Sequence, residues 1–246
     1  MNYVLVGAGG TGSHLCNVLY KYLLARQQED PDWMLYIIDG DHVTVGNTVR
    51  QNFNMEDIDK NKATAMFDRL NDPVHVQEVP AYLSENNIER YVTDGDVILI
   101  GADNYWVRKL IHERALELDN IVVINGGNEM NSGSVQLFIR EEGKNLTPSI
   151  AHLHSEITDA QPTTDRSAMS CAQIAELPGG EQTILANMTS ATFMLAALWR
   201  FHTGYYFGAP TKEPGHIGWT QVQFDHHEGT YVPWDVRNTK NWETNA

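Results

Sequence analysis

The chain has 246 residues, a formal net charge of −15 and an apolar fraction of 42%. This length and composition suit a folded α/β core, and no apolar run reaches the roughly 20 residues of a membrane span. The acidic charge, without clustered Lys and Arg, argues against nucleic acid as the main partner. Met1 leads directly into an apolar run without the basic segment of a signal peptide, so we expect a cytoplasmic protein.

Up to about residue 125, short apolar runs alternate with amphipathic stretches. The apolar runs predict five strands, over residues 3–6, 35–38, 74–79, 96–100 and 121–124. Helical periodicity predicts helices after the first run and over about 62–70 and 104–118. Strands that alternate with helices indicate a mostly parallel sheet flanked by helices, because right-handed crossovers return each strand to the same direction.

After residue 130 the pattern changes. One further strand is predicted over 132–140, and the polar stretch 141–180, without sustained periodicity, is expected to be a flexible loop. A strongly apolar helix is predicted over about 181–202. Its apolar side is predicted from residues spaced along one helical face: Leu185, Met188, Thr192, Leu195, Ala196 and Trp199.

Two last runs, 217–224 and 230–232, predict a closing antiparallel hairpin. No linker separates two domains, so we expect a single domain over 1–246, with a first part over 1–130 and an extension over 131–246. The predicted fold class is α/β, with a Rossmann-like, mostly parallel sheet that C-terminal antiparallel strands extend.

A glycine-rich turn follows the first strand and opens the first helix in the pattern G-x-G-x-x-G: Gly7, Gly9, Gly10 and Gly12, followed by Ser13. Glycine allows the backbone to approach a phosphate closely, and the helix N-terminus offers free N–H groups and partial positive charge. We therefore predict that residues 1–130 bind a nucleotide; the alternative is a tight turn without a ligand. Asp39, at the end of the second strand, suits the hydroxyls of a ribose, which on its own favours NAD.

The segment from Asp39 to Gln51 changes that preference. It resembles the D-x-D-x-V-x-x-S-N-L-x-R-Q signature of the ThiF/MoeB/ubiquitin-activating enzyme superfamily, and departs from it at Gly46 and Thr48. The resemblance implies that the matching polar positions contact the nucleotide: Asp39, Asp41, Asn47, Arg50 and Gln51.

Further motifs of this superfamily follow in order along the chain. The turn has its G-x-G-G-x-G-S pattern, and Lys62 resembles the lysine that opens the family's next helix. The D-x-x-D-N-x-x-x-R motif of the family is matched at Asp103, Asn104 and Arg108, although its first Asp is replaced, and the resemblance implies that these three residues contact the nucleotide. Without the resemblance, Lys62 and Arg108 could equally be surface residues, and Asp103-Asn104 a helix N-cap.

The resemblance implies an ATP-dependent adenylyltransferase that activates the C-terminal glycine of a small ubiquitin-like or sulfur-carrier protein, and that forms a homodimer. Attack of a carboxylate on an α-phosphate needs positive charge to offset the negative charge that develops on phosphorus and pyrophosphate, and Arg50 and Lys62 can supply it. Asp103 follows the end of a strand, where it could hold Mg²⁺. ATP and Mg²⁺ are therefore the expected cofactors.

Cys171 lies in the polar stretch ahead of the last predicted helix, where many members of the superfamily carry a catalytic cysteine. The resemblance implies transfer of the activated acyl group to this thiol, and the alternative is a buried structural cysteine. Cys16, on the apolar side of the first helix, is expected in the core. With 2 cysteines in all, the chain lacks the paired C-x-x-C motifs with which many relatives bind structural zinc.

Three other functions remain open. A catalytically silent subunit would dock the carrier and bind ATP without turnover. An NAD-dependent oxidoreductase would leave Arg50 and Lys62 without a task. Adenylation of a tRNA base, which some relatives perform, is disfavoured by the acidity of the chain.

Overall fold

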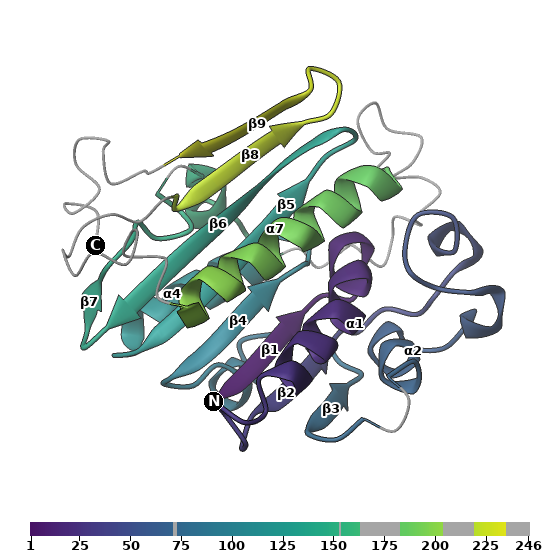
Figure 1. The fold of residues 1–246 in the computed structure, drawn as a ribbon, viewed down its shortest axis with the longest axis horizontal. Helices are drawn as coiled ribbons and strands as arrows, with labels where there is room; N and C mark the ends of the chain where they lie inside the picture. The colour runs from purple at the N-terminus through teal and green to yellow at the C-terminus, as the bar shows by residue number, and fades with distance from the viewer. Residues whose placement is uncertain (71–72, 153, 163–182, 204–218, 235–246) are drawn as a thin grey trace.

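The computed structural model describes residues 1–70, 73–152, 154–162, 183–203 and 219–234. In this part of the chain a nine-stranded sheet forms the centre of the molecule, in the order β3-β2-β1-β4-β5-β6-β8-β9, with β7 paired to β6 (Figure 1). Helices lie on both of its faces, as the alternating pattern predicted.

The parallel strands are β1 (Asn2–Val6), β2 (Met34–Ile38), β3 (Val76–Val79), β4 (Asp96–Ile100) and β5 (Ile121–Asn128). Their sequences are continuous apolar runs because both faces of this part of the sheet are covered; all five residues of β4 are buried. The five predicted strands are confirmed.

The connections between these strands carry helices that the sequence largely predicted. They are α1 (Gly10–Ala25), α2 (Lys62–Asp68), α3 (Ile88–Tyr91) and α4 (Tyr105–Glu117), and two 3₁₀ turns, η1 (Val45–Asn47) and η2 (Met55–Asp57). The short α3 and the two turns were not predicted, since one turn of helix leaves no periodicity in a sequence.

The C-terminal part extends the sheet with antiparallel strands. They are β6 (Ser132–Glu141), β7 (Lys144–Asn145), β8 (Gln221–Asp225) and β9 (Thr230–Trp234), and β8 and β9 form the predicted closing hairpin. Strand β5 is longer than the predicted 121–124, because Asn125 to Asn128 continue the ladder opposite Gly133 to Gln136 of β6. That polar stretch lacked an apolar signal, and only its pairing with β6 makes it a strand.

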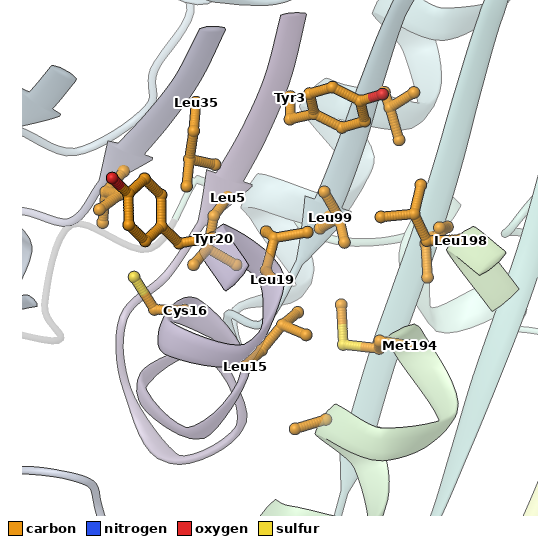
Figure 2. Close-up of a cluster of buried hydrophobic side chains, with 14 of the residues drawn as sticks. Tyr3, Leu5, Leu15, Cys16, Leu19, Tyr20, Leu35, Leu99, Met194 and Leu198 are labelled. Atoms are coloured by element: carbon orange, nitrogen blue, oxygen red, sulfur yellow. The ribbon is translucent and has the colours of Figure 1, made fainter. Parts of the chain in front are cut away.

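Two layers of side chains fill the space between the sheet and its helices. On one face α1 and α7 (Ile184–Thr203) pack beside each other, and Figure 2 shows Leu15 and Leu19 of α1 near Met194 and Leu198 of α7 over the strand residue Leu99. The other face is covered by α3 and α4, whose apolar side chains pack on the alternate residues of the same strands.

The predicted apolar side of α7 is wrong. Leu185, Met188, Thr192 and Trp199 are exposed, and Leu195 and Ala196 are only partly buried. The buried side is made of small, polar and apolar residues: Ala186, Asn187, Ser190, Ala191, Met194, Ala197 and Leu198. Because this helix is apolar on both sides, its periodicity could not identify the side that packs on the sheet.

The stretch predicted as a loop, 141–180, contains more local structure than expected in the part that the structure describes. The end of β6 is followed by β7 and by one helical turn, α5 (Ser155–Thr158). Cys171 lies outside the described residues. In the described ranges, no helix combines the length and the hydropathy that crossing a membrane requires.

Candidate functional site

The strand order predicts a crevice at the carboxyl ends of β1 and β4. The chain runs from β1 outward through β2 to β3 and then returns to β4 on the opposite side of β1. At such a switch point the turns that follow the two central strands diverge, and ligands of open α/β sheets bind there. The turns that follow β1 and β4 are in contact where they begin, since a Cβ on Gly7 would lie 2.7 Å from the backbone nitrogen of Ala102.

The predicted glycine-rich turn follows β1 at this end of the sheet, and its glycines differ in their surroundings. Gly7 has a φ of +89°, which side chains rarely adopt. A Cβ on Gly12 would lie 1.8 Å from the Gly7 carbonyl oxygen, so α1 packs against the turn only without it. Gly9, the N-cap of α1, has no atom within 4 Å of its Cβ position. Other atoms thus occupy the space beside Gly7 and Gly12, whereas the space beside Gly9, at the N-terminus of α1, is open.

Asp39 connects the glycine-rich turn to the end of β2. One carboxylate oxygen accepts the backbone N–H of Ala8 at 2.7 Å, and the other accepts that of Asp41 at 2.8 Å. Burial raises the pKa of Asp39, an effect that the nearby Lys62 charge opposes. Each oxygen keeps a further lone pair, so the predicted contact with a ribose stays compatible with these bonds.

Lys62 begins α2 and is buried, with its ammonium 2.9 Å from a carboxylate oxygen of Asp41. Asn61 caps the helix by accepting the N–H groups of Ala63 and Thr64, which fixes the position from which Lys62 extends. Lys62 therefore places a positive charge near two carboxylates, Asp39 and Asp41, which both follow the end of β2.

Tyr82 completes this cluster and was missed by the sequence analysis. Its hydroxyl donates a hydrogen bond to Asp41, and its ring covers Gly40, whose Cβ would lie 2.6 Å from the ring. Burial, followed by the bond to Asp41, raises the pKa of Tyr82. Its position three residues after β3 was the available signal, since β3 is one of the parallel strands that end at this edge.

The segment that carries Arg50 folds back onto α1. The Asn47 side chain accepts the N–H of Thr44 at 2.9 Å, and its carbonyl accepts the N–H of Gln51 at 2.8 Å, so both residues shape the turn. The Ser13 hydroxyl accepts the N–H of Asn52 at 3.0 Å. Asn47, Gln51 and Ser13, which the sequence predicted as nucleotide contacts, thus have structural tasks, and direct contact with a ligand stays a prediction.

The last predicted motif follows β4. Asn104 caps α4 by accepting the N–H of Trp106 at 2.9 Å, which is the alternative the sequence left open. Arg108 is buried and donates to the carbonyls of Ala102 at 3.1 Å and Gly126 at 3.2 Å, so it holds this turn against β5. Asp103 lies exposed between them at the crevice.

The sequence matches the ThiF family over residues 1–215. The chain belongs to the ThiF family. Among curated proteins it is similar to the SAMP-activating enzyme E1 of Haloferax volcanii, with 30% identity over 127 residues, which are 50% of this chain and 44% of that protein. The chain thus matches less than half of the length of this relative.

Two kinds of solved structure show the fold of this ThiF-family chain. PaaA is 19% identical with a TM-score of 0.65, covering 96% of this chain and 64% of that one. MccB from E. coli, in a structure with ATP, is 16% identical with a TM-score of 0.66, covering 95% of this chain and 63% of that one. This chain spans less than two thirds of either, and the predicted Rossmann-like fold class is confirmed.

Within this ThiF-family site, the structure brings Asp39, Asp41 and Lys62 together and leaves Cys171 outside the described residues. Asp103 is the predicted Mg²⁺ ligand. Among the residues that the structure describes, no group of three or more His, Cys, Asp and Glu side chains is arranged to hold a metal ion. An exposed single carboxylate fits Mg²⁺, which usually keeps several waters and binds through one or two carboxylates and the phosphates of a substrate.

Proposed function

We propose that the chain is an ATP-dependent adenylyltransferase that activates the C-terminal carboxylate of a small ubiquitin-like or sulfur-carrier protein. The observation that carries the proposal is the open N-terminus of α1 at Gly9, in a turn that Asp39 connects to Asp41, the partner of the buried ammonium of Lys62. A helix N-terminus and a fixed cation form a site for a polyphosphate. Membership of the ThiF family and similarity to an enzyme named SAMP-activating enzyme E1 support the substrate class.

In the proposed reaction a carboxylate oxygen of the carrier attacks the α-phosphorus of ATP. An acyl–O–P bond forms, the bond between the α-phosphorus and the bridging oxygen to the β-phosphate breaks, and pyrophosphate leaves with that electron pair. Negative charge grows on the phosphoryl oxygens and on the leaving group, and preorganised positive charge lowers that barrier. Lys62, the N–H groups of α1 and Arg50 provide it.

Mg²⁺, when bound, would neutralise charge on the leaving pyrophosphate, and Asp103 is the residue that would hold it. Asp39 would accept hydrogen bonds from the ribose and Asp41 keeps Lys62 in place. Arg108, engaged with two backbone carbonyls, supports the turn that presents Asp103. Some residues of the site would thus act on the phosphates, and others would hold those residues in position.

The test is exchange of labelled pyrophosphate into ATP, measured with a panel of small carriers that end in Gly-Gly. Lys62→Ala is expected to lower the exchange rate by about 10²-fold or more. Lys60→Ala, which removes the same charge from an exposed neighbour paired with Asp57 and Asp68, should leave it unchanged. Equal loss in both variants, or no exchange with any carrier, contradicts the proposal. ATP binding without exchange would indicate a silent docking subunit, and binding of NADH instead of ATP an oxidoreductase.

We also propose that the acyl group then passes to Cys171, whose thiolate would attack the acyl carbon and release AMP. Thiol labelling can test this because Cys16 is fully buried, and burial raises the pKa of its thiol to about 12. Rapid labelling of the folded protein should therefore be lost in Cys171→Ala, together with the thioester-linked carrier adduct that this transfer would form. An adduct that persists in Cys171→Ala would exclude this cysteine as the acceptor.

We further propose that the protein acts in the cytoplasm as a homodimer, an expectation that comes from the family resemblance. Light scattering of the purified protein at micromolar concentration tests the oligomeric state. A mass near the 27.7 kDa of one chain would contradict the dimer.

A further inference from the structure

Asn187 lies on the buried side of α7, where this helix passes the start of α1, and it has no exposed surface. Its side-chain nitrogen donates to the carbonyl oxygen of Arg50 at 3.0 Å. Its side-chain oxygen accepts from Asn128 at 2.8 Å, and the Asn128 oxygen accepts the Thr11 hydroxyl at 2.9 Å. Four segments far apart in the sequence thus meet in one chain of hydrogen bonds.

We propose that Asn187 is a positioning residue for Arg50, through which α7 fixes the arginine segment over the glycine-rich turn. This inference rests on the proposed function, because the consequence of the position is catalytic. Asn187 acts through the Arg50 carbonyl, on the backbone from which the Arg50 side chain extends.

The direction of each hydrogen bond explains why an asparagine is needed. The Arg50 carbonyl can only accept, so the amide nitrogen of Asn187 must face it. The amide oxygen then faces the donor on Asn128. An aspartate could not donate to Arg50, and a leucine of similar shape could make neither bond. Space is also limited, because a Cβ on Gly10 would lie 2.5 Å from the Asn187 oxygen. A side chain at Gly10 would therefore displace the Asn187 amide from this position.

Further bonds to this segment come from α1. His14 reaches the same Arg50 carbonyl at 3.3 Å, and Ser13 holds the N–H of Asn52. Asn187 adds a hydrogen bond from α7, so both α1 and α7 hold the segment that carries Arg50. A shift of about 1 Å in a catalytic group can cost about 10²-fold in rate, which is why a second tether matters for Arg50.

A double-mutant cycle tests the catalytic consequence. Asn187→Leu should lower carrier-dependent pyrophosphate exchange by about 10-fold or more, with a change in the KM for ATP below about threefold. Ser190→Ala is the matched control, since Ser190 is buried one turn further along α7 and its hydroxyl has no partner among the described residues. In an Arg50→Ala background, Asn187→Leu should add less than about twofold. Full additivity of the two losses would overturn the proposal.

Trypsin provides a readout that needs no catalysis. The bond after Arg50 involves the carbonyl that Asn187 holds, so its cleavage in the native protein should be several-fold faster in Asn187→Leu than in Ser190→Ala, while other sites are cut at unchanged rates. Equal rates of cleavage after Arg50 in the two variants would overturn the proposal that Asn187 holds this segment. If the wild-type protein shows no exchange, the proposed function fails and this measurement still decides the position of the segment.

A second variant covers the case in which Asn187→Leu does not fold. Asn128→Ala removes the donor that orients the Asn187 amide and lies in a partly buried position. It should accelerate the same cleavage selectively, though by less. Unchanged cleavage after Arg50 in this variant would overturn the hydrogen-bonded chain as the origin of the tether.

Discussion

The buried ammonium of Lys62 lies 2.9 Å from a carboxylate oxygen of Asp41, whose side chain is 50% exposed. The positive charge is therefore removed from water while its partner stays at the surface. In water an ion pair of this kind is weak, but a buried cation depends on its partner. Lys62 is thus a cation that Asp41 holds in place.

The first prediction concerns this pair. Asp41→Asn keeps the size of the side chain but removes its charge, and it should lower the free energy of unfolding by about 1–3 kcal/mol. The matched control is Asp68→Asn, since Asp68 pairs with Lys60 at 3.1 Å and both side chains are exposed. That change should cost less than about 1 kcal/mol. Urea denaturation at neutral pH measures both, and equal losses would contradict a special dependence of Lys62 on Asp41.

The second prediction separates two glycines of the same turn. Gly9→Ala places a methyl group where no atom lies within 4 Å, so it should change the free energy of unfolding by less than about 1 kcal/mol. It should weaken ATP binding at least about tenfold, because the methyl group occupies the space that the proposed phosphate needs.

Gly12→Ala is the contrasting variant of this turn. Its Cβ would lie 1.8 Å from the Gly7 carbonyl oxygen, and the variant should lose about 3 kcal/mol or more of stability. Calorimetric titration with ATP and thermal unfolding distinguish the two effects. Unaltered ATP affinity in a folded Gly9→Ala protein would place the phosphates elsewhere.

The third prediction concerns the side of α7 that packs on the sheet. Met188 is 51% exposed and Met194 is fully buried. Met194→Ala should therefore cost about 2–5 kcal/mol, while Met188→Ala should stay within about 0.5 kcal/mol. The two variants differ only in position along one helix, so chemical denaturation compares them directly. A larger loss of stability in Met188→Ala than in Met194→Ala would instead support the buried side of α7 that the sequence predicted.

The elements of the fold were predictable because buried parallel strands are continuous apolar runs. β4 is an example, since all five of its residues are buried and its predicted bounds match those of the structure. The packing of α7 was not predictable, because its buried side includes Asn187 and Ser190 while Leu185 and Met188 face outward. Tertiary partners decide such cases, and a single sequence does not display them.

The candidate site was predictable to a similar degree. The glycines, Asp39 and Lys62 were found because their spacing matches a known signature, and the structure places them at one edge of the sheet. The pairing of Lys62 with Asp41 was not predicted, since it depends on how the start of α2 lies against the segment after β2. Asn187 carried no signal at all, because one asparagine in an apolar helix is indistinguishable from a tolerated polar residue.

The last prediction concerns His202, near the C-terminal end of α7. Its two ring nitrogens each lie 2.9 Å from a tyrosine hydroxyl, Tyr3 on one side and Tyr22 on the other, and the Tyr22 ring stacks on it at 9°. A neutral imidazole donates at one nitrogen and accepts at the other, so it satisfies both hydroxyls. Burial, with a smaller contribution from the Arg26 charge, lowers the pKa of His202 from 6.5 to about 4.

The sign of the pH dependence follows from this shift. Between pH 6.5 and about 4 the unfolded chain binds a proton at His202 more readily than the folded chain does. The contribution of His202 to stability is therefore complete above pH 6.5 and is lost as the pH falls toward 4. His202→Gln keeps a donor and an acceptor but does not titrate, so the stability gap between wild type and variant should narrow from pH 7.5 to 4.5. His14 and His112, whose pKa values burial also lowers, titrate in both proteins and cancel in the difference. A gap that stays constant over this range would show that His202 binds its proton equally in both states.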